Sequence, residues 1–472
     1  MKEELTAIVG EKYVSDDIID RYVYGSDASI HQKMPEIVVR PGTVEEVSRI
    51  LKFANEKKIP VVARGAGSGM SGNAVPMSGG IILDLKRMDK ILEIKPEDLY
   101  VRVEAGVVND ELNRVLKPYG FFFAPNPASG KICTIGGMVA NNASGMRAVK
   151  YGATRDAVMG LKIVLASGEV LDAGTKTLIE SSGYQIERLM VGSEGTLGII
   201  VEATLRLTPL PKEKSMGVAA FNKLSGAGEA VSKIIAAGII PSFLEYMDNV
   251  AIKSVNKMLN LNLPDVEAIV VFECDGVRED IDYNIERIKK VCTEQGATGI
   301  KVSSDPKEMN EIYLGRSKLF PAMSQYQDGL VVTSLADDMA VPNSKIAEVS
   351  EKIHEIAKRN EVVITTYGHA GEGLIHTKLL IDPTKQINWE HAKNAVAEIY
   401  ETVISVGGTV SGEHGVAISK APYFKKERAG LLKMFHMIKK TFDPNNILNP
   451  GKLQDAPDDF LTATEIRYPV ED

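Results

Sequence analysis

A glycine-rich loop directly after a buried strand constrains the fold of this chain more than any other feature. Residues 59–65 (IPVVARG) are a short apolar run, and residues 67–72 (GSGMSG) then match the pattern GxGxxG. In a Rossmann nucleotide-binding fold this pattern opens a helix. Here residues 73–80 contain a proline and two glycines, which interrupt a helix. The sequence therefore argues against a Rossmann fold. The glycines and Arg64 can still form a phosphate-binding nest of backbone N–H groups, and an ordinary glycine-rich turn is the alternative for this loop taken alone.

The segment before this loop predicts a strand, a turn, an amphipathic helix and a second strand. Residues 36–67 begin with an apolar run, pass through a Pro-Gly turn and return to the buried run at residues 59–65. Thr43 precedes the helical pattern, and Glu46 follows three residues later. This spacing predicts a capping box at the start of the helix.

Two further segments are rich in small residues. Residues 125–156 are dense in Gly, Asn, Ser and Ala, which lets a backbone approach a flat ligand closely. Residues 189–209 carry Gly192, Gly195 and Gly198 at threefold spacing, followed by a β-like run. Three such segments in one half of the chain favour a shared ligand site over unrelated turns.

The chain length and one change in pattern predict the domain boundaries. At roughly 150 residues per domain, 472 residues predict two or three domains. Two prolines and three charges interrupt the pattern at residues 208–214, where we place a boundary. We expect a helical lead-in, a first domain, a second domain of alternating helices and strands, and an acidic, loosely packed tail. Their ranges are 1–34, 35–213, 214–455 and 456–472.

Composition excludes several classes of protein. A net charge of −8 argues against nucleic acid and anionic membranes as partners. No apolar run approaches the ~20 residues of a transmembrane helix, and the charged N-terminus lacks the apolar region of a secretory signal. The three cysteines, Cys133, Cys274 and Cys292, form no CxxC motif. We therefore expect reduced thiols, a cytoplasmic location, and neither a disulfide nor an iron–sulfur cluster held by this chain.

Two histidine-containing motifs predict a metal site. If residues 372–373 form a two-residue hairpin turn, His369 faces His376 across the ladder, with Cβ atoms about 4.5–5.5 Å apart. In a later glycine-flanked loop, Glu413 can complete the ligand set while His414 faces a substrate. Two histidines and one carboxylate suit Zn²⁺, Fe²⁺ or Mn²⁺. A purely structural histidine pair is the alternative at this point.

The glycine-rich motifs resemble a known family. RGAGSGMSG, CTIGGMVANNASGMRAVKYGATRD and VGSEGTLGIIVEATLRL are similar to the FAD-binding domain of the glycolate oxidase and D-lactate dehydrogenase family. That family has the vanillyl-alcohol oxidase/p-cresol methylhydroxylase (PCMH) fold, and the resemblance runs from about residue 35 to 455. It implies an α+β protein, with a two-subdomain FAD-binding domain of the PCMH type and a C-terminal α+β substrate (cap) domain.

The resemblance also implies which residues hold the FAD. The pyrophosphate would contact Arg64, Gly65, Ala66, Gly67, Ser68, Gly69 and Ser71. The pyrophosphate and isoalloxazine would be lined by Thr134, Gly136, Gly137, Asn141, Ser144 and Gly145. The adenosine side would be bordered by Glu194, Gly198 and Ile200, and Asn449 would lie near the flavin. Because Ala66–Gly69 contains no His, Cys or Tyr, we expect the FAD to be non-covalent.

The same resemblance assigns roles in the second half of the chain. GHAGEGLIH resembles the family's Gly-His-x-Gly-Asp-Gly-Asn-x-His, and SGEHG matches its Gly-Glu-His-Gly. The implied metal ligands are His369, His376 and Glu413, and His414 is the implied base. Arg316 occupies the position that grips a substrate carboxylate in the family, for which a guanidinium is suited.

Three departures from the family pattern bear on specificity. Glu372 and Leu374 replace the usual Asp and Asn, and Leu374 cannot donate a side-chain hydrogen bond to order the metal ligands. Ala336 stands where some dicarboxylate-specific relatives have a Lys. This favours an acid smaller than 2-hydroxyglutarate.

The implied function is an FAD-dependent dehydrogenase that oxidises a D-2-hydroxy acid, D-lactate or glycolate above all. Electrons must leave through a partner: an iron–sulfur subunit, an electron-transfer flavoprotein, a cytochrome or a quinone. A homodimer or a hetero-oligomer fits this need, peripheral to a membrane through the partner. The alternatives are a D-2-hydroxyglutarate-type dehydrogenase, a non-redox FAD transferase resembling alkylglycerone-phosphate synthase, a companion subunit without catalysis and a metal hydrolase.

Overall fold

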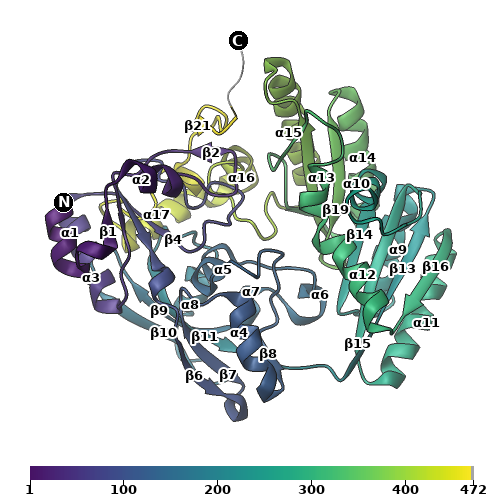
Figure 1. The fold of residues 1–472 in the computed structure, drawn as a ribbon, viewed down its shortest axis with the longest axis horizontal. Coiled ribbons are helices and arrows are strands. Elements are labelled where there is room, and N and C mark those ends of the chain that lie inside the picture. Colours follow the sequence, from purple (N-terminus) through teal and green to yellow (C-terminus); the bar gives the residue numbers. More distant parts are fainter. Residues whose placement is uncertain (469–472) are drawn as a thin grey trace. The chain divides into compact units, whose positions relative to one another are not determined.

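A computed structural model describes residues 1–468, which form two compact units (Figure 1). Unit 1 consists of Met1–Ser144, Gly152–Leu210 and Glu413–Arg467. Unit 2 contains Gly145–Tyr151 and Pro211–Gly412. The chain therefore leaves unit 1 near the boundary predicted at residues 208–214, and the last segment returns to it.

The first sheet of unit 1 combines parallel and antiparallel pairs. Its order is β1 (Val14–Ser15), β3 (Ile37–Val39), β5 (Ile81–Asp84) and β4 (Val61–Arg64). β3 and β4 run parallel to β5, whereas β1 is antiparallel to β3. α1 (Lys2–Val9) and α3 (Val44–Lys57) contribute to the same hydrophobic core.

The sequence of α3 explains both its start and its packing. Val47, Ile50, Leu51 and Ala54 are buried, and their three-to-four-residue spacing places them on one face. Thr43 Oγ1 accepts a hydrogen bond from the N–H of Glu46 at 3.2 Å, so the predicted cap is confirmed on that side. The Glu46 carboxylate accepts instead from the N–H of Gly42, one residue before the cap.

The second sheet of unit 1 is wholly antiparallel. Its order is β10 (Val170–Gly174), β9 (Val158–Val164), β11 (Ile199–Arg206), β7 (Tyr100–Glu104) and β6 (Ile91–Lys95). α5 (Ile135–Asn141) packs on β11 and β7. The remaining elements of this part are α2 (Ile18–Tyr24), α4 (Asn109–Leu116), α7 (Thr154–Ala157), α8 (Ile186–Met190) and the pair β8 (Phe121–Phe122) and β12 (Thr208–Pro209).

The C-terminal segment is an integral part of unit 1. It contains α16 (Ala421–Glu427) and α17 (Leu432–Phe442), and Ile447 and Leu448 join the core of the first sheet. The sequence analysis placed residues up to 455 in the second domain and expected a loose tail after them. Within the described residues that tail is packed: Ala456 and Phe460 are buried, and β21 (Glu465–Ile466) pairs with β2 (His31–Gln32). Residues 469–472 of the tail lie outside the described residues.

Unit 2 is built on one eight-stranded antiparallel sheet (Figure 1). Its main order is β16 (Ala297–Ser303), β13 (Glu213–Phe221), β15 (Ala268–Gly276), β14 (Phe243–Asp248), β19 (Val363–Gly368), β20 (Leu374–Ile381) and β17 (Val331–Thr333), and β18 (Met339–Ala340) also pairs with β20. The helices are α6 (Ala148–Tyr151), α9 (Leu224–Ala236), α10 (Asn249–Leu259), α11 (Arg278–Glu294), α12 (Pro306–Ser317), α13 (Leu319–Met323), α14 (Ile346–Arg359) and α15 (Gln386–Ser405).

The alternation of side chains along β14 decides which residues reach the site. Phe243 and Met247 share a core cluster with residues of α10 and α13. Tyr246 points the other way, because its hydroxyl is 3.2 Å from Ser350 Oγ on α14. Successive strand residues face opposite sides of a sheet. Glu245 therefore lies on the α10 face, where Arg316 of α12 meets it.

Two predictions from composition can be compared with the structure. Cys133, Cys274 and Cys292 are all buried free thiols. In the part of the chain that the structure describes, every helix is too short or too polar to cross a bilayer.

Candidate functional site

The loop after β4 in unit 1 presents unpaired backbone donors. Between β4 and β5 the described chain contains no helix, as the rejection of a Rossmann fold requires. None of the N–H groups of Ala66–Gly72 donates a hydrogen bond to a described residue, and Ala63–Met70 is only half-buried. Because buried or half-buried N–H groups are normally paired, this row of donors suits an anionic group such as a pyrophosphate.

The second small-residue segment packs against this loop because Gly65 has no side chain. A Cβ on Gly65 would lie 2.2 Å from Thr134 Oγ1. Thr134 is the N-cap of α5 and accepts a hydrogen bond from the N–H of Gly137 at 3.4 Å. Gly136 is similarly restricted, since its Cβ would lie 2.7 Å from the Cβ of Ala105. Glycine at these positions therefore brings two segments into contact.

A buried network around Glu194 supports the loop. Its carboxylate accepts hydrogen bonds from Asn73 Nδ2 at 2.8 Å and from the N–H groups of Val416 and Ala417 at 2.7 and 3.0 Å. Asn449 Nδ2 donates to the carbonyl oxygens of Glu194 and Asn73. Burial raises the pKa of Glu194. The network joins the glycine-rich loop to the C-terminal segment within unit 1.

Three buried oxygens near this network lack a hydrogen-bond partner among the described residues. They are Asn73 Oδ1, Ser193 Oγ and Asn449 Oδ1. Asn73 Oδ1 is adjacent to the glycine-rich loop, because a Cβ on Gly69 would lie 2.7 Å from it. A buried polar atom without a partner costs about 1–3 kcal/mol. These atoms and the free loop amides fit a polar cofactor such as FAD.

Lys452 is a buried cation in the same network that the sequence analysis did not identify. Its ammonium donates to the carbonyl oxygens of Gly72 and Val75, the latter at 2.6 Å. Burial lowers its pKa to about 7. In the sequence Asn449-Pro-Gly-Lys452 a role is predicted for Asn449 alone, whereas the structure shows that Lys452 also contacts the glycine-rich loop.

Several residues predicted to bind FAD make contacts of their own in unit 1. Arg64 Nη1 donates to the carbonyl oxygen of Ser26 at 2.7 Å, and burial lowers the pKa of Arg64. Ser71 Oγ donates to the carbonyl oxygen of Gly415 at 3.1 Å. Asn141 Nδ2 donates to the carbonyl oxygen of His414 at 3.4 Å.

The other predicted FAD residues are placed as follows. The N–H of Ser144 donates to Glu413 Oε2 at 3.2 Å. Gly198 packs against the Ile163 side chain, and Ile200 is buried in the core of the second sheet. Gly145 begins the segment that clusters with unit 2. Contact of these residues with FAD stays a prediction.

In unit 2, the connection between β19 and β20 differs from the predicted hairpin. β19 ends at Gly368, Ala370–Glu372 form a 3-10 turn, and the ladder pairs Tyr367 with His376. The predicted two-residue turn, with His369 directly opposite His376, is therefore wrong, because the helical turn adds residues to the connection. The imidazoles nevertheless meet, with ring centroids 5.2 Å apart.

Each of these histidines is held by a buried carboxylate. His369 Nδ1 lies 2.7 Å from Glu245 Oε1, and His376 Nδ1 lies 3.1 Å from Asp337 Oδ1. A carboxylate at Nδ1 favours the tautomer in which Nδ1 carries the proton and Nε2 carries the lone pair. Metal-binding histidines are commonly oriented in this way. The residues present therefore fit a metal site with two Nε2 ligands.

Each carboxylate in turn faces a buried cation. Arg316 Nε donates to Glu245 Oε2 at 2.5 Å, and the Lys378 ammonium donates to Asp337 Oδ2. All four side chains are at most 7% exposed. Buried charges are tolerated when they are paired and hydrogen-bonded, and unit 2 meets this condition twice.

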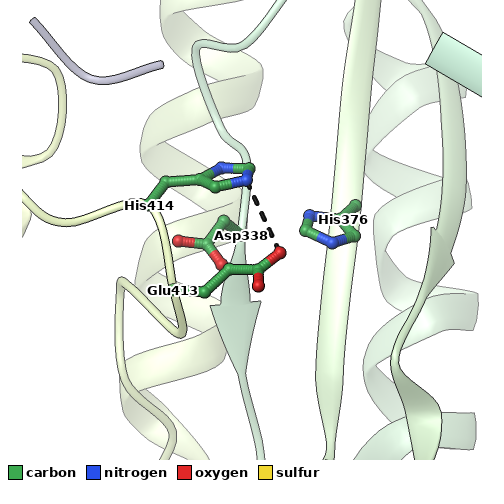
Figure 2. A group of neighbouring side chains, drawn as sticks. All are labelled: Asp338, His376, Glu413 and His414. Atoms are coloured by element: carbon green, nitrogen blue, oxygen red, sulfur yellow. Dashed lines mark ion pairs between the residues drawn. The ribbon is translucent and has the colours of Figure 1, made fainter. Parts of the chain in front are cut away.

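Four side chains each offer one atom that can bind a metal ion: Asp338, His376, Glu413 and His414 (Figure 2). Within unit 2, Asp338 accepts hydrogen bonds from the N–H of Gly412 at its carbonyl oxygen and from Ser411 Oγ at its carboxylate. Glu413 and His414 follow Gly412 directly in the chain and belong to unit 1. There His414 Nε2 lies 3.6 Å from Glu413 Oε1, the pair marked by the dashed line in Figure 2.

The sequence analysis missed Glu245, Asp337, Asp338 and Lys378. Glu245 and Lys378 are single charges within apolar strands, FLEYMD and LIHTKLLI, and this was a usable signal. A charge in a fully buried strand requires a partner. The two aspartates directly follow Ala336 in the chain, where the family resemblance points to Ala336 alone.

The residues that depart from the family pattern have clear positions. Leu374 is buried and packs against Gly412, since a Cβ there would lie 2.4 Å from Leu374 Cδ1. An apolar side chain at this position therefore supports the Ser411–Gly412 backbone instead of donating a hydrogen bond. Glu372 lies in the 3-10 turn, and Ala336 is fully buried.

Unit 1 contains one mixed sheet and one antiparallel sheet, and unit 2 contains an antiparallel sheet with helices on both faces. This arrangement is that of flavoproteins with the PCMH/vanillyl-alcohol oxidase fold. A solved structure of p-cresol methylhydroxylase with substrate bound superposes with a TM-score of 0.77, at 18% identity, covering 95% of each chain. This likeness confirms the predicted fold class.

The chain belongs to the FAD-linked oxidase family. Residues 35–174 match the "FAD binding domain" family and residues 210–453 match "FAD linked oxidases, C-terminal domain". The "Glycolate oxidase subunit GlcD" of Bacillus subtilis is 38% identical, covering 96% of each chain. The "D-lactate dehydrogenase" of Anaerostipes hadrus is 32% identical, covering 93% of this chain and 94% of its own. The resemblance inferred from the motifs is thereby confirmed.

Proposed function

We propose that this chain is an FAD-dependent dehydrogenase that oxidises a D-2-hydroxy acid, D-lactate or glycolate, to the 2-oxo acid. The observation that carries the proposal is the pair of carboxylate-backed histidines in unit 2, in a chain whose other unit has an FAD-binding domain. Relatives called glycolate oxidase subunit and D-lactate dehydrogenase support this substrate class.

The glycine-rich loop of unit 1 would hold the FAD without a covalent bond. The free N–H groups of Ala66–Gly72 would bind the pyrophosphate, and the orphaned oxygens of Asn73 and Asn449 would accept hydrogen bonds from the cofactor. Bound FAD supplies an acceptor for a hydride. Without a nucleophilic side chain, Ala66–Gly69 offers no attachment point for the flavin.

As the family resemblance implies, a divalent metal would be held by His369, His376 and Glu413. The group of candidate ligands in Figure 2 contains His376 and Glu413 but not His369, and it adds Asp338 and His414. The two Nε2 atoms are oriented for this by the carboxylates at Nδ1. A bound metal ion supplies positive charge that lowers the pKa of a coordinated hydroxyl group.

His414 and Arg316 would act on the substrate itself. Arg316 would grip the carboxylate through Nη1, which makes no hydrogen bond with a described residue. Neutral His414 would accept the hydroxyl proton while the hydride leaves the adjacent carbon for FAD. The substrate thus loses one proton and one hydride, and the carbon–oxygen single bond becomes a carbonyl.

Substrate size and electron transfer complete the proposal. The small, buried Ala336 side chain offers no positive charge for a second carboxylate, which favours a monocarboxylic acid. Reduced FAD must pass its electrons to an iron–sulfur subunit, an electron-transfer flavoprotein, a cytochrome or a quinone. The Bacillus relative is called a subunit, which supports a partner protein.

An anaerobic screen tests the proposal. The FAD-loaded protein is mixed with D-lactate, L-lactate, glycolate, D-2-hydroxyglutarate and buffer, and loss of the oxidised flavin's visible absorbance is followed. We expect bleaching by D-lactate or glycolate. Bleaching by D-2-hydroxyglutarate alone would favour the dicarboxylate alternative. A flavin that none of these acids reduces would contradict the proposed chemistry.

A further inference from the structure

We infer that Glu245 and Asp337 are positioning residues with different tasks. Glu245 couples a metal ligand to the residue that binds the substrate carboxylate, whereas Asp337 positions a metal ligand alone. The inference rests on the proposed function, since it assumes that His369 and His376 bind the metal and that Arg316 binds the substrate. The contacts concerned all lie within unit 2.

Glu245 uses its two carboxylate oxygens for two different partners. Oε1 lies 2.7 Å from His369 Nδ1, and Oε2 accepts from Arg316 Nε at 2.5 Å. The Glu245 side chain is fully buried on a central strand of the sheet. Neither partner can turn without losing a charge-assisted hydrogen bond where water cannot replace it.

Arg316 is held by its salt bridge to Glu245 and by the ring of Tyr367, so a change in the orientation of Arg316 is transmitted to Glu245. Its guanidinium carbon lies 4.9 Å from the centre of the Tyr367 ring, and Nη2 is 3.5 Å from His369 Nδ1. Nη1 makes no hydrogen bond with a described residue and is the atom left for a ligand. A carboxylate bound there favours the guanidinium orientation that also fixes His369.

Asp337 also bridges a histidine and a buried cation, but its cation is bound by other groups of the protein. Oδ1 lies 3.1 Å from His376 Nδ1, and Oδ2 accepts from the Lys378 ammonium. That ammonium also donates to Ser334 Oγ at 2.8 Å and lies 5.1 Å from the Phe320 ring. Lys378 is 1% exposed. Lys378 neutralises Asp337 and is held by other groups of the protein. The branch formed by His376, Asp337 and Lys378 therefore does not include the residue proposed to bind the substrate.

The two branches therefore predict different consequences for the same loss of charge. Either carboxylate orients one metal ligand, so removing either charge weakens metal binding. Only Glu245 also orients Arg316, so only its removal weakens substrate binding once the metal site is filled. By linkage, substrate and metal strengthen each other's binding through Glu245 and not through Asp337.

The experiment compares Glu245→Gln with Asp337→Asn, each close to isosteric. Asp248→Asn is the matched control. Asp248 is an equally buried carboxylate on β14, and its Oδ2 lies 3.2 Å from Nε2 of a different histidine, His354. Metal affinity is measured without substrate, by titrating metal-stripped, FAD-loaded protein with Zn²⁺ against a chelator. KM and kcat for D-lactate or glycolate are then measured at saturating Zn²⁺.

We expect both site variants to bind Zn²⁺ about 10–100-fold more weakly than the wild type, and the control to bind it normally. At saturating metal, Glu245→Gln should raise KM about tenfold, while Asp337→Asn keeps the wild-type KM. If either neutral variant fails to fold, Glu245→Asp and Asp337→Glu are measured in its place. These variants keep the charge but shift its position, and they should change the same quantities.

Three outcomes would overturn the inference. Equal rises in KM for the two site variants would remove the distinction between the branches. Unchanged Zn²⁺ affinity in both, with a wild type that binds Zn²⁺, would show that the carboxylates do not position the histidines. A wild type whose weak Zn²⁺ binding equals that of His376→Ala would overturn the proposed metal site itself, and the inference with it.

Discussion

The two units build their candidate sites in opposite ways. In unit 1 the site is made of backbone: glycines let the loop at Ala66–Gly72 present N–H groups and pack against Thr134. In unit 2 it is made of buried ionised side chains, Glu245 and Asp337 with their cations, on strands that are otherwise apolar. One site depends on the absence of side chains, and the other on side chains that are costly to bury.

This difference teaches how each kind of site withstands mutation. A backbone site is damaged by adding atoms, since there is no room for them. A site of buried ions is damaged by removing charge, because the partner is left unpaired. The following predictions test this contrast, beginning with the largest expected effect.

His414→Ala should separate chemistry from cofactor binding most clearly. Loss of a general base typically slows proton transfer by about 10²–10⁴-fold, while the loop amides that are proposed to hold FAD are unchanged. Stopped-flow reduction of the flavin by saturating substrate measures the rate, and the absorbance spectrum measures FAD content. His436→Ala, at an exposed side chain paired with Asp455, is the control. Reduction at the wild-type rate would refute the base assignment.

Glu245→Ala should destabilise the protein by about 3–5 kcal/mol, because it leaves Arg316 buried without its carboxylate. The matched exposed pair is Glu213 with Arg278, where Glu213→Ala should cost no more than about 1 kcal/mol. Denaturant unfolding followed by circular dichroism gives both values. Similar small losses for the two variants would mean that burial does not set the importance of the ion pair.

Gly65→Ala should weaken FAD binding by adding a single methyl group. Overlap with Thr134 Oγ1 forces a shift of the loop, and overpacking of this kind costs about 1–3 kcal/mol, or roughly 5–150-fold in the FAD dissociation constant. The affinity for Zn²⁺ should not change. Gly430→Ala is the control, since nothing lies within 4 Å of a Cβ there. FAD affinity equal in the two variants would argue against a backbone site.

Lys452→Met should change how the free energy of unfolding depends on pH. Burial lowers the pKa of Lys452 from 10.5 to about 7. Between these pH values the unfolded chain binds a proton that the folded chain lacks, so the wild type gains stability as pH rises from 7 to 10.5. Below pH 7 the lysine is protonated in both states and adds no slope.

The free energy of unfolding of the wild type minus that of Lys452→Met should therefore rise between pH 7 and 10.5 and stay level below pH 7. Urea unfolding at several pH values measures this difference. Parallel curves for the two proteins over the whole range would mean that the buried ammonium does not titrate as described.

The same contrast explains what the sequence could predict. The glycine pattern after a strand, with Thr43 and its cap, correctly indicated the local fold of unit 1, because backbone requirements are written directly in residue type. The predicted contact of His369 and His376 was found, but its geometry was wrong. Gly373 follows directly after the 3-10 turn and would have been part of the two-residue turn, so the glycine alone did not decide between them.

The remaining features depend on contacts between distant parts of the chain. Glu245 meets Arg316 and His369 only once three separate elements are assembled. The return of the last segment to unit 1 likewise depends on Ile447 and Leu448 reaching the first sheet. Local patterns carry no information on such pairings, although a lone charge in an apolar strand does indicate that a partner exists.

The most direct test of the central claim is the flavin content of the purified chain before and after acid precipitation. If the backbone amides of unit 1 hold FAD without a covalent bond, the yellow protein should carry about one FAD per chain and release all of it into the supernatant. A colourless protein that takes up no FAD, or flavin that stays with the precipitated polypeptide, would contradict the account.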